Sequence, residues 1–238
     1  MTRFTLIVAL IATVKYFFRY RVRPYSLMCR KGTRFGPSYS DAGQDLFVNL
    51  LLRAKPAGTF VEIGSQDPIK NNNTFLLETI LGWKGIAFEL RDTYVRFYNW
   101  RRTNPCIQGD ATKIDYRTCF SERGFPSRID FLQVDIEPAQ ATLDALMTLP
   151  HDKYRFSIIT FEHDGYQNDN EITGASRAFL SGLGYHLLVA NVMISGAIFE
   201  DWWIDPSSCD ISPKLTRVQL TTIDYALALS ELSVITSQ

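Results

Sequence analysis

The sequence has few cysteines, and they do not form a recognisable module. Cys29, Cys106, Cys119 and Cys209 lie far apart without a C-x-x-C pair. This spacing argues against both a zinc module and a disulfide scaffold, which need closely spaced or paired cysteines. We therefore expect a reducing compartment and a cytoplasmic protein.

The sequence also lacks an excess charge of either sign. Lys and Arg total 25, as do Asp and Glu, so the formal net charge is zero. A nucleic-acid-binding domain usually carries a basic excess or patch, so we expect no nucleic-acid partner. Repeats and low-complexity tracts are missing too, and 46% of the 238 residues are hydrophobic, enough for one domain with a sizeable core.

A hydrophobic run long enough to span a bilayer is missing as well. Residues 4–18 are mostly apolar but include Lys15, and three arginines follow at Arg19, Arg21 and Arg23. Fifteen helical residues reach only about 22 Å, against roughly 30 Å of hydrocarbon. A secretory signal would place its charge before the apolar stretch and a small-residue cleavage site after it.

Two interpretations of this segment remain. One is a membrane-surface or short signal-anchor helix over residues 4–23, held at the cytoplasmic face by its basic cluster. The other is a helix packed on the domain. We divide the chain into an N-terminal segment, residues 1–25, and a folded domain, residues 36–238.

From residue 40 onward, strand-like and helix-period segments alternate, which predicts a parallel sheet covered by helices. Asp41 is the expected cap of a first helix carrying Leu46–Leu51. The expected strands are Thr59–Ile63, Gly85–Glu89, Cys106–Gly109, Ile129–Val134 and Phe156–Phe161. The expected helices are 72–81, 92–102, 138–149, 171–183 and a late helix, 225–232. Residues 185–192 and 196–203 predict a hairpin that places an antiparallel strand at one edge of the sheet.

Every expected parallel strand ends in acidic residues. In open parallel sheets ligands bind beyond the carboxyl ends of the strands, so these exits are the informative positions. Five acidic exits are unlikely to coincide by chance. They are Glu62-Ile63-Gly64-Ser65-Gln66-Asp67, Glu89, Asp110-Ala111, Asp135-Ile136-Glu137 and Glu162-His163-Asp164.

The first exit turns at Gly64 but lacks the G-x-G-x-x-G phosphate cradle. A dinucleotide needs free amides at a helix N-terminus for its pyrophosphate, and carboxylates at Glu62 and Asp67 would repel that anion. A nicotinamide dinucleotide is therefore disfavoured. A ligand with a positive centre fits better.

The next two exits indicate what that ligand is. Glu89 follows the second strand, where a carboxylate accepts from both hydroxyls of a ribose. Asp110 is placed to accept from an exocyclic amine, and Ala111 offers a backbone amide to a ring nitrogen. A ribose, an adenine and a positive centre without phosphate describe S-adenosylmethionine.

At these residues the chain resembles class I methyltransferases of the FkbM type, over about residues 40–206. The resemblance rests on Gly43–Val48, Phe60–Gly64, Asn72–Glu78, Gly82–Glu89, Ile129–Glu137 and Phe199–Trp203. It implies a Rossmann-like, seven-stranded, three-layer α/β fold and S-adenosylmethionine as methyl donor. It also implies a small-molecule or glycan acceptor, methylated on a hydroxyl.

The resemblance assigns roles by position. The methionine-side loop comprises Glu62, Gly64, Ser65 and Asp67. Glu89 holds the ribose, and Asp110 and Ala111 hold the adenine. Asp135 and Glu137 fall on the acidic segment after the fourth parallel strand.

The chain departs from that family's usual pattern at Pro68, Leu90, Pro138 and Gln140. Pro68 replaces a usual glycine, which removes an amide and fixes φ near −65°. These departures motivate an alternative function, a non-catalytic, membrane-tethered interaction module on a retained methyltransferase fold.

Methylation of a hydroxyl needs a base for the acceptor's proton. His163, between Glu162 and Asp164, is our first candidate, because neighbouring carboxylates orient an imidazole and raise its pKa. Asp135 is the alternative base. A divalent ion held by Asp135, Glu162 and His163 would polarise the hydroxyl instead, but we expect no metal.

One aromatic and basic segment needs a separate interpretation. Arg96, Arg101 and Arg102 lie among Tyr98 and Trp100, a mixture that also occurs where bases stack. At helical spacing we expect instead a solvated arginine face beside a buried aromatic one.

Overall fold

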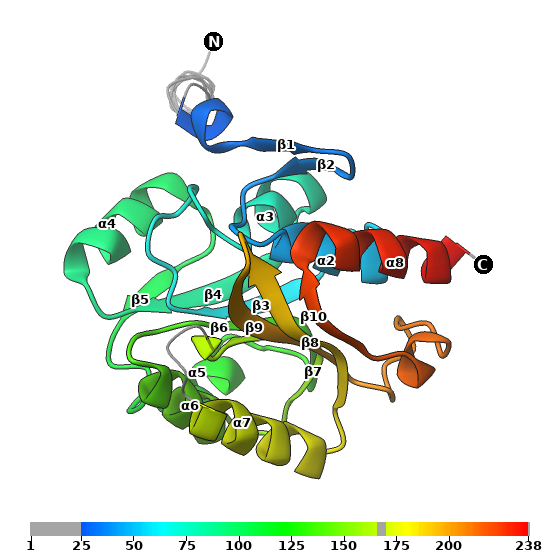
Figure 1. Ribbon diagram of the computed structural model, residues 1–238. Coiled ribbons are helices and arrows are strands. Elements are labelled where there is room, and N and C mark those ends of the chain that lie inside the picture. The colour runs from blue at the N-terminus through cyan, green and yellow to red at the C-terminus, as the bar shows by residue number, and fades with distance from the viewer. Residues whose placement is uncertain (1–24, 166–169, 238) are drawn as a thin grey trace, which may run out of the picture.

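A computed structural model describes residues 25–165 and 170–237 of the chain. Its centre is an eight-stranded sheet in the order β10-β8-β9-β7-β6-β3-β4-β5 (Figure 1). The strands are β3 (Thr59–Ile63), β4 (Lys84–Glu89), β5 (Cys106–Gln108), β6 (Arg128–Val134), β7 (Arg155–Glu162), β8 (His186–Ile194), β9 (Ala197–Ile204) and β10 (Leu220–Asp224). A separate small hairpin pairs β1 (Lys31–Thr33) with β2 (Gly36–Ser38).

The direction of winding reverses between β3 and β6. From β3 the chain adds β4 and then β5 on one side, and it then returns to place β6 and β7 on the other. All these neighbours pair in parallel, with Phe60 opposite Phe131 at the point of reversal. A reversal of this kind opens a crevice beyond the strand ends, where ligands bind in Rossmann-like sheets.

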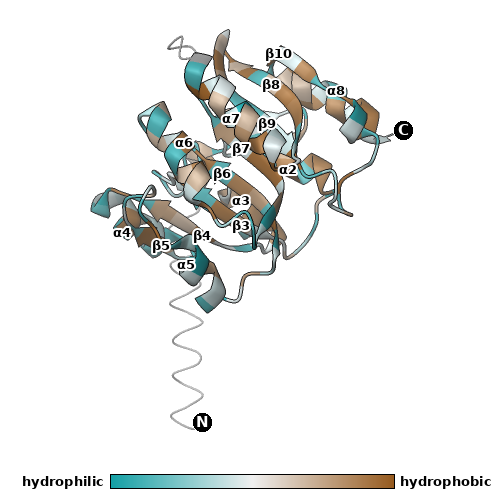
Figure 2. Cartoon of the chain, turned by 90° about the horizontal axis from the view of Figure 1, so that it is seen from below, coloured by the Kyte–Doolittle hydropathy of each residue, from teal (hydrophilic) through white to brown (hydrophobic). Residues whose placement is uncertain are grey.

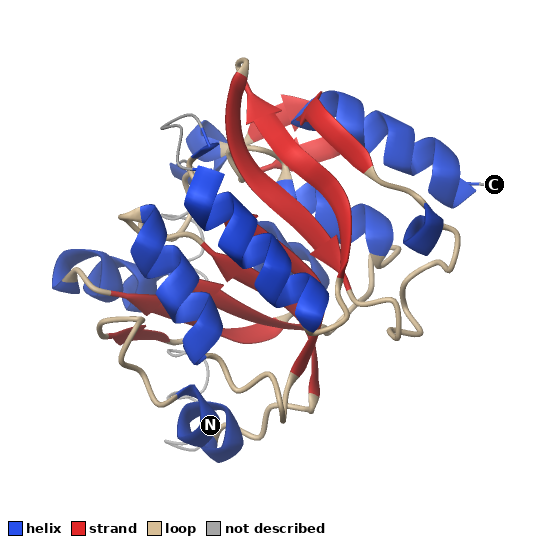
Figure 3. Cartoon of the chain, turned by 60° about the horizontal axis from the view of Figure 1, so that its bottom comes forward, coloured by secondary structure: helices blue, strands red, loops and turns tan. Residues whose placement is uncertain are grey.

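Helices cover both faces of the sheet, which makes a three-layer sandwich. One layer holds α2 (Gln44–Leu51), α3 (Phe75–Leu81) and α8 (Tyr225–Ser237). The other holds α5 (Tyr116–Glu122), α6 (Ala139–Thr148) and α7 (Asn170–Gly182), the last two lying across the strands in Figure 3. The remaining helix, α4 (Asp92–Arg101), packs beside β4 and β5.

Successive side chains along each strand point to opposite faces of the sheet, so the hydrophobic core has two parts, one on each face. Phe60 and Trp202 point into the core beneath α2 and α3, whereas Val61 and Trp203 point into the core beneath α5 to α7. Both tryptophans are fully buried, and Trp202 stacks on Phe47 with ring centroids 4.2 Å apart. Figure 2 shows the result, with hydrophobic strands at the centre and hydrophilic stretches on outer helices such as α4 and α6.

The α/β prediction is confirmed, but two details of the sheet were wrong. The sheet has eight strands rather than seven, because β10 pairs in parallel with β8 at the edge. The antiparallel strand is β9, and it lies inside the sheet between β7 and β8 rather than at the edge. The hairpin itself was predicted, but its outer strand gains a further partner from the C-terminal segment.

The start of α2 also differs from the prediction. Gly43, at φ 69°, precedes the helix, and Asp41 forms an ion pair with Lys31 instead of capping it. The buried carboxylate here is Asp45, which accepts from the Ser38 hydroxyl and the Tyr39 amide. Burial raises its pKa, and these hydrogen bonds oppose the rise.

The arginine face predicted on α4 is only partly present. Tyr98 is buried and Arg96 is exposed, as expected. Arg102, however, is buried, and Trp100 is 59% exposed. Arg102 turns inward because buried carboxylates from α3 and β3 lie beneath it.

Within the described part of the chain, no helix is long and apolar enough to cross a membrane. Residues 4–23, for which a membrane-surface helix and a helix packed on the domain are both open interpretations, lie outside the described residues.

Candidate functional site

A cavity of about 570 Å³ lies at the reversal point of the sheet, where the loops after β3, β4, β5 and β6 meet. This is the size of a pocket for a small organic ligand. Its wall is formed by Gly64, Gln66, Phe88, Glu89, Leu90, Arg91, Gly109, Asp110, Ala111, Thr112, Asp135, Ile136, Glu137, Ala141 and Asp144. Five of the residues predicted to bind the cofactor are therefore together in one wall, namely Gly64, Glu89, Asp110, Ala111 and Asp135.

Gly64 is required by both its backbone angle and its surroundings. Its φ is 87°, which side chains other than glycine's rarely tolerate. A Cβ here would lie 1.6 Å from the carbonyl oxygen of Asp135. The glycine thus lets the β3 and β6 exits pass close together, and the cavity forms beside that crossing.

Glu89 lies at the wall with its carboxylate almost fully desolvated, at 6% exposure. One oxygen accepts from the Gln66 amide at 3.0 Å and the other from the Arg91 amide at 2.9 Å. Each carboxylate oxygen has a second lone pair. Glu89 therefore ties the β3 loop to the β4 loop and keeps acceptor capacity for a ligand.

Asp110 stays ionised at the far end of the cavity. Its carboxylate accepts from Lys113 Nζ at 2.7 Å and from the Thr112 hydroxyl and amide. Chiefly through the Lys113 contact, its pKa falls to about 2. Ala111, next in the chain, is anchored by the Tyr116 hydroxyl, which donates to its carbonyl at 2.7 Å.

Three predicted cofactor residues do not line this cavity: Glu62 in β3, and Ser65 and Asp67 in the loop that follows it. The Glu62 carboxylate accepts from the Thr74 hydroxyl at 3.0 Å, and burial raises its pKa to about 7. Ser65 Oγ lies 3.5 Å from Cys106 Sγ. Asp67 accepts from the Tyr25 hydroxyl at 2.6 Å and from two amides of its own turn.

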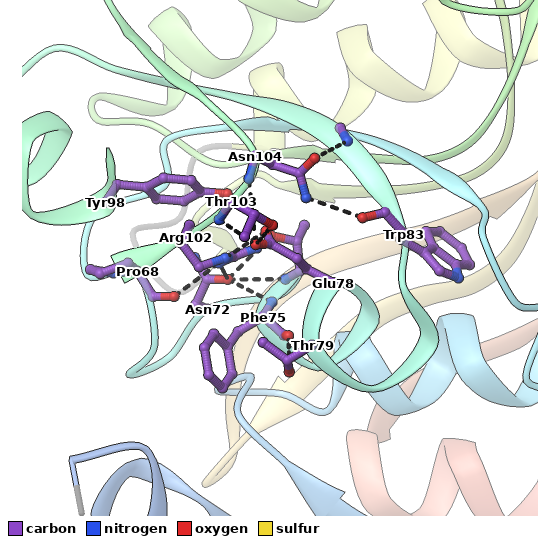
Figure 4. Close-up of polar contacts among 12 residues, drawn as sticks. Pro68, Asn72, Phe75, Glu78, Thr79, Trp83, Tyr98, Arg102, Thr103 and Asn104 are labelled. Carbon is purple, nitrogen blue, oxygen red and sulfur yellow. Dashed lines mark hydrogen bonds and ion pairs between the residues drawn. The ribbon is translucent and has the colours of Figure 1, made fainter. Parts of the chain in front are cut away.

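A buried cation fixes the segment that follows this loop (Figure 4). The Arg102 guanidinium, fully buried, donates to Glu78 at 2.7 Å. It also donates, at 2.9 Å each, to the Pro68 carbonyl, Asn72 Oδ1 and Thr74 Oγ1. We call these residues, together with the neighbouring Glu62, the Arg102 cluster. It was missed in the sequence because its members are spread over 41 positions, from residue 62 to residue 102.

On the other side of the cavity two carboxyl groups share a hydrogen bond. Asp135 lines the cavity and hydrogen-bonds with Glu162 at the end of β7. Burial raises the pKa of Asp135 to about 6, and burial together with the Asp135 charge raises that of Glu162 far above its ordinary value. Both shifts favour one proton held between these two partly buried carboxyl groups, because adjacent carboxylates do not readily both ionise.

A third carboxyl lies behind this pair. Glu200 of β9 is the register partner of Glu162 across the antiparallel ladder and is fully buried. Trp202 Nε1 donates to its Oε1 at 2.6 Å, and the Gln44 side chain also lies within hydrogen-bonding reach of the carboxyl. Burial raises its pKa to about 8. Asp135, Glu162 and Glu200 are called the acidic cluster below.

A second cavity, of about 400 Å³, opens beside the first. Glu137 lines both, and Pro138, Ala139 and Asp164 complete the described wall of the second. The two acidic exits of β6 and β7 thus face one open space next to the deeper cavity. A molecule placed there would contact Glu137, the residue that lines both cavities.

The histidine predicted to act as the base does not reach either cavity. His163 is fully buried, and its Nε2 lies 3.3 Å from Asp201 Oδ1. Asp201 in turn receives two hydrogen bonds from Arg177 of α7. This arrangement joins β9 to α7 and gives His163 a structural setting, because its ring faces β9 rather than the β6 exit.

In the two described stretches, 25–165 and 170–237, no group of three or more histidine, cysteine or carboxylate side chains is arranged to hold a metal ion. The predicted alternative ligands, Asp135, Glu162 and His163, are not brought together, since His163 turns toward Asp201.

Comparisons with known proteins give structural similarities only. No family model and no curated sequence matches the chain. Among solved structures it is similar to a putative rRNA methylase from Clostridium thermocellum, with 13% identity, TM-score 0.47, and coverage of 70% of this chain and 95% of that one. It is also similar to a TehB-like SAM-dependent methyltransferase from Corynebacterium glutamicum, with 11% identity, TM-score 0.46, and coverage of 82% and 98%.

A third similar structure is M. capricolum TrmK in complex with S-adenosyl-homocysteine, with 10% identity, TM-score 0.46, and coverage of 73% of this chain and 74% of that one. The strand order and pairing described above establish the Rossmann-like fold of this chain.

Proposed function

We propose that this protein is an S-adenosylmethionine-dependent methyltransferase whose acceptor is a hydroxyl of a sugar, a glycan or another small molecule. The observation that carries the proposal is the arrangement of the cavity at the sheet reversal. Glu89 and Asp110 stand on one side, and the Asp135–Glu162 pair stands on the other. A carboxylate row of this kind suits a ligand with hydroxyls, an amine and a positive centre, and it opposes phosphate.

The residues in the wall fit the donor in chemistry and in size. Glu89 offers a desolvated carboxylate to ribose hydroxyls, and Asp110 offers an ionised one to the adenine amine. Phe88, Leu90 and Ile136 add apolar surface for the ring. When bound, S-adenosylmethionine supplies an electrophilic methyl group on a positively charged sulfur.

The methionine-side residues act in this proposal through the loop that they hold. Asp67 closes the turn after Gln66, and Glu62 lies among the side chains that fix Thr74. Gln66 itself lines the cavity and bonds to Glu89. Ser65, buried between them, keeps the loop close to β5.

Asp135 is the proposed base. Its carboxylate lines the cavity, and a pKa of about 6 leaves it largely ionised at neutral pH yet able to accept a proton. Glu162, which keeps its proton, hydrogen-bonds to Asp135 and holds it in place. When the methyl group transfers, its bond to the donor sulfur would break and S-adenosylhomocysteine would leave, while Asp135 would take the proton that the acceptor hydroxyl loses. His163 has no part in this scheme because it lies outside both cavities.

Calorimetric titration of the full chain with S-adenosylmethionine, S-adenosylhomocysteine and NAD tests the donor assignment. We expect saturable, micromolar-range binding of the first two and none of NAD. Glu89→Ala should weaken binding about 10- to 100-fold, the usual cost of losing a charged hydrogen-bond acceptor. Glu122→Ala, an exposed carboxylate on α5, is the matched control and should bind like the wild type.

Unchanged affinity in Glu89→Ala would remove the ribose assignment, and binding of NAD alone would overturn the proposal. Donor binding without methyl transfer to any member of a sugar and glycolipid panel would favour the non-catalytic module that Pro68 and Gln140 motivate.

A further inference from the structure

Exposed apolar side chains gather where the described chain begins. Leu27 and Met28, in the short helix over residues 25–29, are 55% and 83% exposed, and Trp100 of α4 is 59% exposed. The two elements are joined by aromatic contacts, with Tyr25 6.1 Å from Phe97 and Phe97 6.1 Å from Trp100. Single exposed apolar residues are ordinary, but a group shared by two touching elements marks an interaction surface.

The same surface carries cations. The Arg101 guanidinium lies 4.0 Å above the Trp100 ring and 5.7 Å from the Tyr25 ring. Its Nε is buried and has no hydrogen-bond partner among the described residues. Arg30 and Lys70 are exposed nearby, the latter close enough to act electrostatically on Cys29. We call Leu27, Met28, Arg30, Trp100 and Arg101 the Trp100 face.

The carboxylate of this region is already engaged. Asp67 accepts from the Tyr25 hydroxyl and from the amides of Ile69 and Lys70. The residues that make up the Trp100 face are therefore apolar or positively charged. A surface of this composition matches an anionic lipid bilayer, where tryptophan lies at the headgroup level and arginine reaches the phosphates.

The described chain begins at Tyr25, which contacts Phe97 beside this face. Residues 4–18 are mostly apolar, Arg19, Arg21 and Arg23 follow them, and Tyr25 is the first described residue. The apolar and basic composition of the segment thus continues, without a break in the chain, into that of the Trp100 face.

We propose that the Trp100 face docks on a membrane surface rich in anionic phospholipid. Trp100, Leu27 and Met28 enter the boundary between headgroups and acyl chains, and Arg101 and Arg30 bind lipid phosphates. Because Tyr25 bonds to Asp67, and Gln66 beside it lines the main cavity, docking brings the rim of that cavity close to the bilayer. This proposal stands independently of the methyltransferase assignment.

Tryptophan fluorescence of the full chain provides a direct test. Trp83, Trp202 and Trp203 are buried at 2% exposure or less, so Trp100 is the solvent-exposed tryptophan of the four. With vesicles of phosphatidylcholine and phosphatidylserine we expect a blue shift of the emission and loss of iodide quenching. Phosphatidylcholine vesicles alone should give a smaller change. In Trp100→Phe this fluorescence response should be lost, which assigns the signal to Trp100.

Flotation with the same vesicles measures affinity. Arg101→Gln should weaken binding about fivefold, as expected for one basic residue at an anionic surface. Leu27→Ser combined with Met28→Ser should weaken it further. Met147→Ser on α6, a residue 54% exposed elsewhere, is the matched control and should have no effect.

Three results would overturn the proposal. The first is a full chain that does not bind anionic vesicles. The second is a vesicle-bound chain whose Trp100 stays open to iodide. The third is protection of Trp100 by RNA oligonucleotides, or by a second copy of the chain in sedimentation experiments, without any vesicle response.

Discussion

Two clusters of ionisable side chains flank the candidate cavity, one built around a buried cation and the other made of carboxyl groups alone. In the Arg102 cluster a guanidinium lies among Glu62, Glu78 and several neutral acceptors, with each of its three nitrogens bonded. In the acidic cluster three carboxyl groups lie together, and among the described residues no arginine or lysine pairs with them. Each cluster supports a different loop of the same cavity.

This difference in charge pairing indicates that one cluster has a structural role and the other a chemical one. A buried cation that is fully hydrogen-bonded fixes its surroundings, and removing it leaves buried charge behind. Buried carboxyls without a cation instead keep their protons and titrate near neutral pH, as groups at functional sites often do. In the proposed function, the Arg102 cluster supports the donor side of the cavity and the acidic cluster is the side that moves protons.

The largest expected effect on stability comes from removing the buried cation of the Arg102 cluster. Arg102→Met should lower the free energy of unfolding by about 3–5 kcal/mol, because Glu78 and Glu62 lose their cation while staying buried. Urea denaturation followed by circular dichroism measures it. Arg96→Met, which removes an exposed i,i+4 pair with Asp92, is the control and should change stability by less than about 0.5 kcal/mol. A loss below about 1 kcal/mol in Arg102→Met would contradict the supporting role.

Asp135 should matter for rate rather than for stability. Asp135→Asn removes the proposed base, so turnover should fall about 100-fold or more while donor affinity stays within a few-fold. The measurement is formation of S-adenosylhomocysteine with the best acceptor of a sugar and glycolipid panel. Asp144→Asn, which alters an exposed carboxylate in the same wall, is the control. Equal turnover in Asp135→Asn and wild type would remove Asp135 from the chemistry.

The acidic cluster should make stability fall as pH rises. Burial raises the pKa of Glu200 from 4.5 to about 8, so the folded state binds a proton that the unfolded chain releases. The resulting stabilisation is complete below the unfolded pKa and is lost as pH rises through the folded one. We expect a loss on the order of 4 kcal/mol between about pH 5 and pH 8.5, with a smaller slope in Glu200→Gln. Identical slopes in the two proteins would place the titration elsewhere.

The smallest effect on turnover is expected from His163. His163→Ala leaves the proposed base and both cavities unaltered, so turnover should fall less than about fivefold, well below a general-base contribution of about 10²–10⁴. The assay is run at a temperature where the variant is fully folded, because the buried His163–Asp201 contact is lost. A fall of 100-fold or more would return His163 to the mechanism.

Much of the fold followed from the sequence, because apolar runs bounded by turn residues identify interior strands. Thr59–Ile63 was predicted with its observed limits, and Gly82 and Gly184 mark the ends of the helices before them. β10 was not foreseen, since Leu220–Asp224 is short and mostly polar, and only its pairing with β8 makes it a strand.

The candidate site was predictable as a set of strand exits but not in its side-chain directions. Parallel strands bring their carboxyl ends to one edge, so Glu89, Asp110 and Asp135 had to lie near one another. The direction of His163 depends on Asp201, 38 residues later, and the burial of Arg102 depends on Glu78, 24 residues earlier. Such long-range partners leave no local pattern in the sequence.

The most direct test of the acidic cluster is a carboxyl titration by ¹³C NMR on the full chain, comparing wild type with Asp135→Asn. We predict a carboxyl resonance that titrates with an apparent pKa near 6 in the wild type and is absent from the variant. If every aspartate resonance instead titrates near or below its ordinary value, the pair does not hold a shared proton, and Asp135 is not the base.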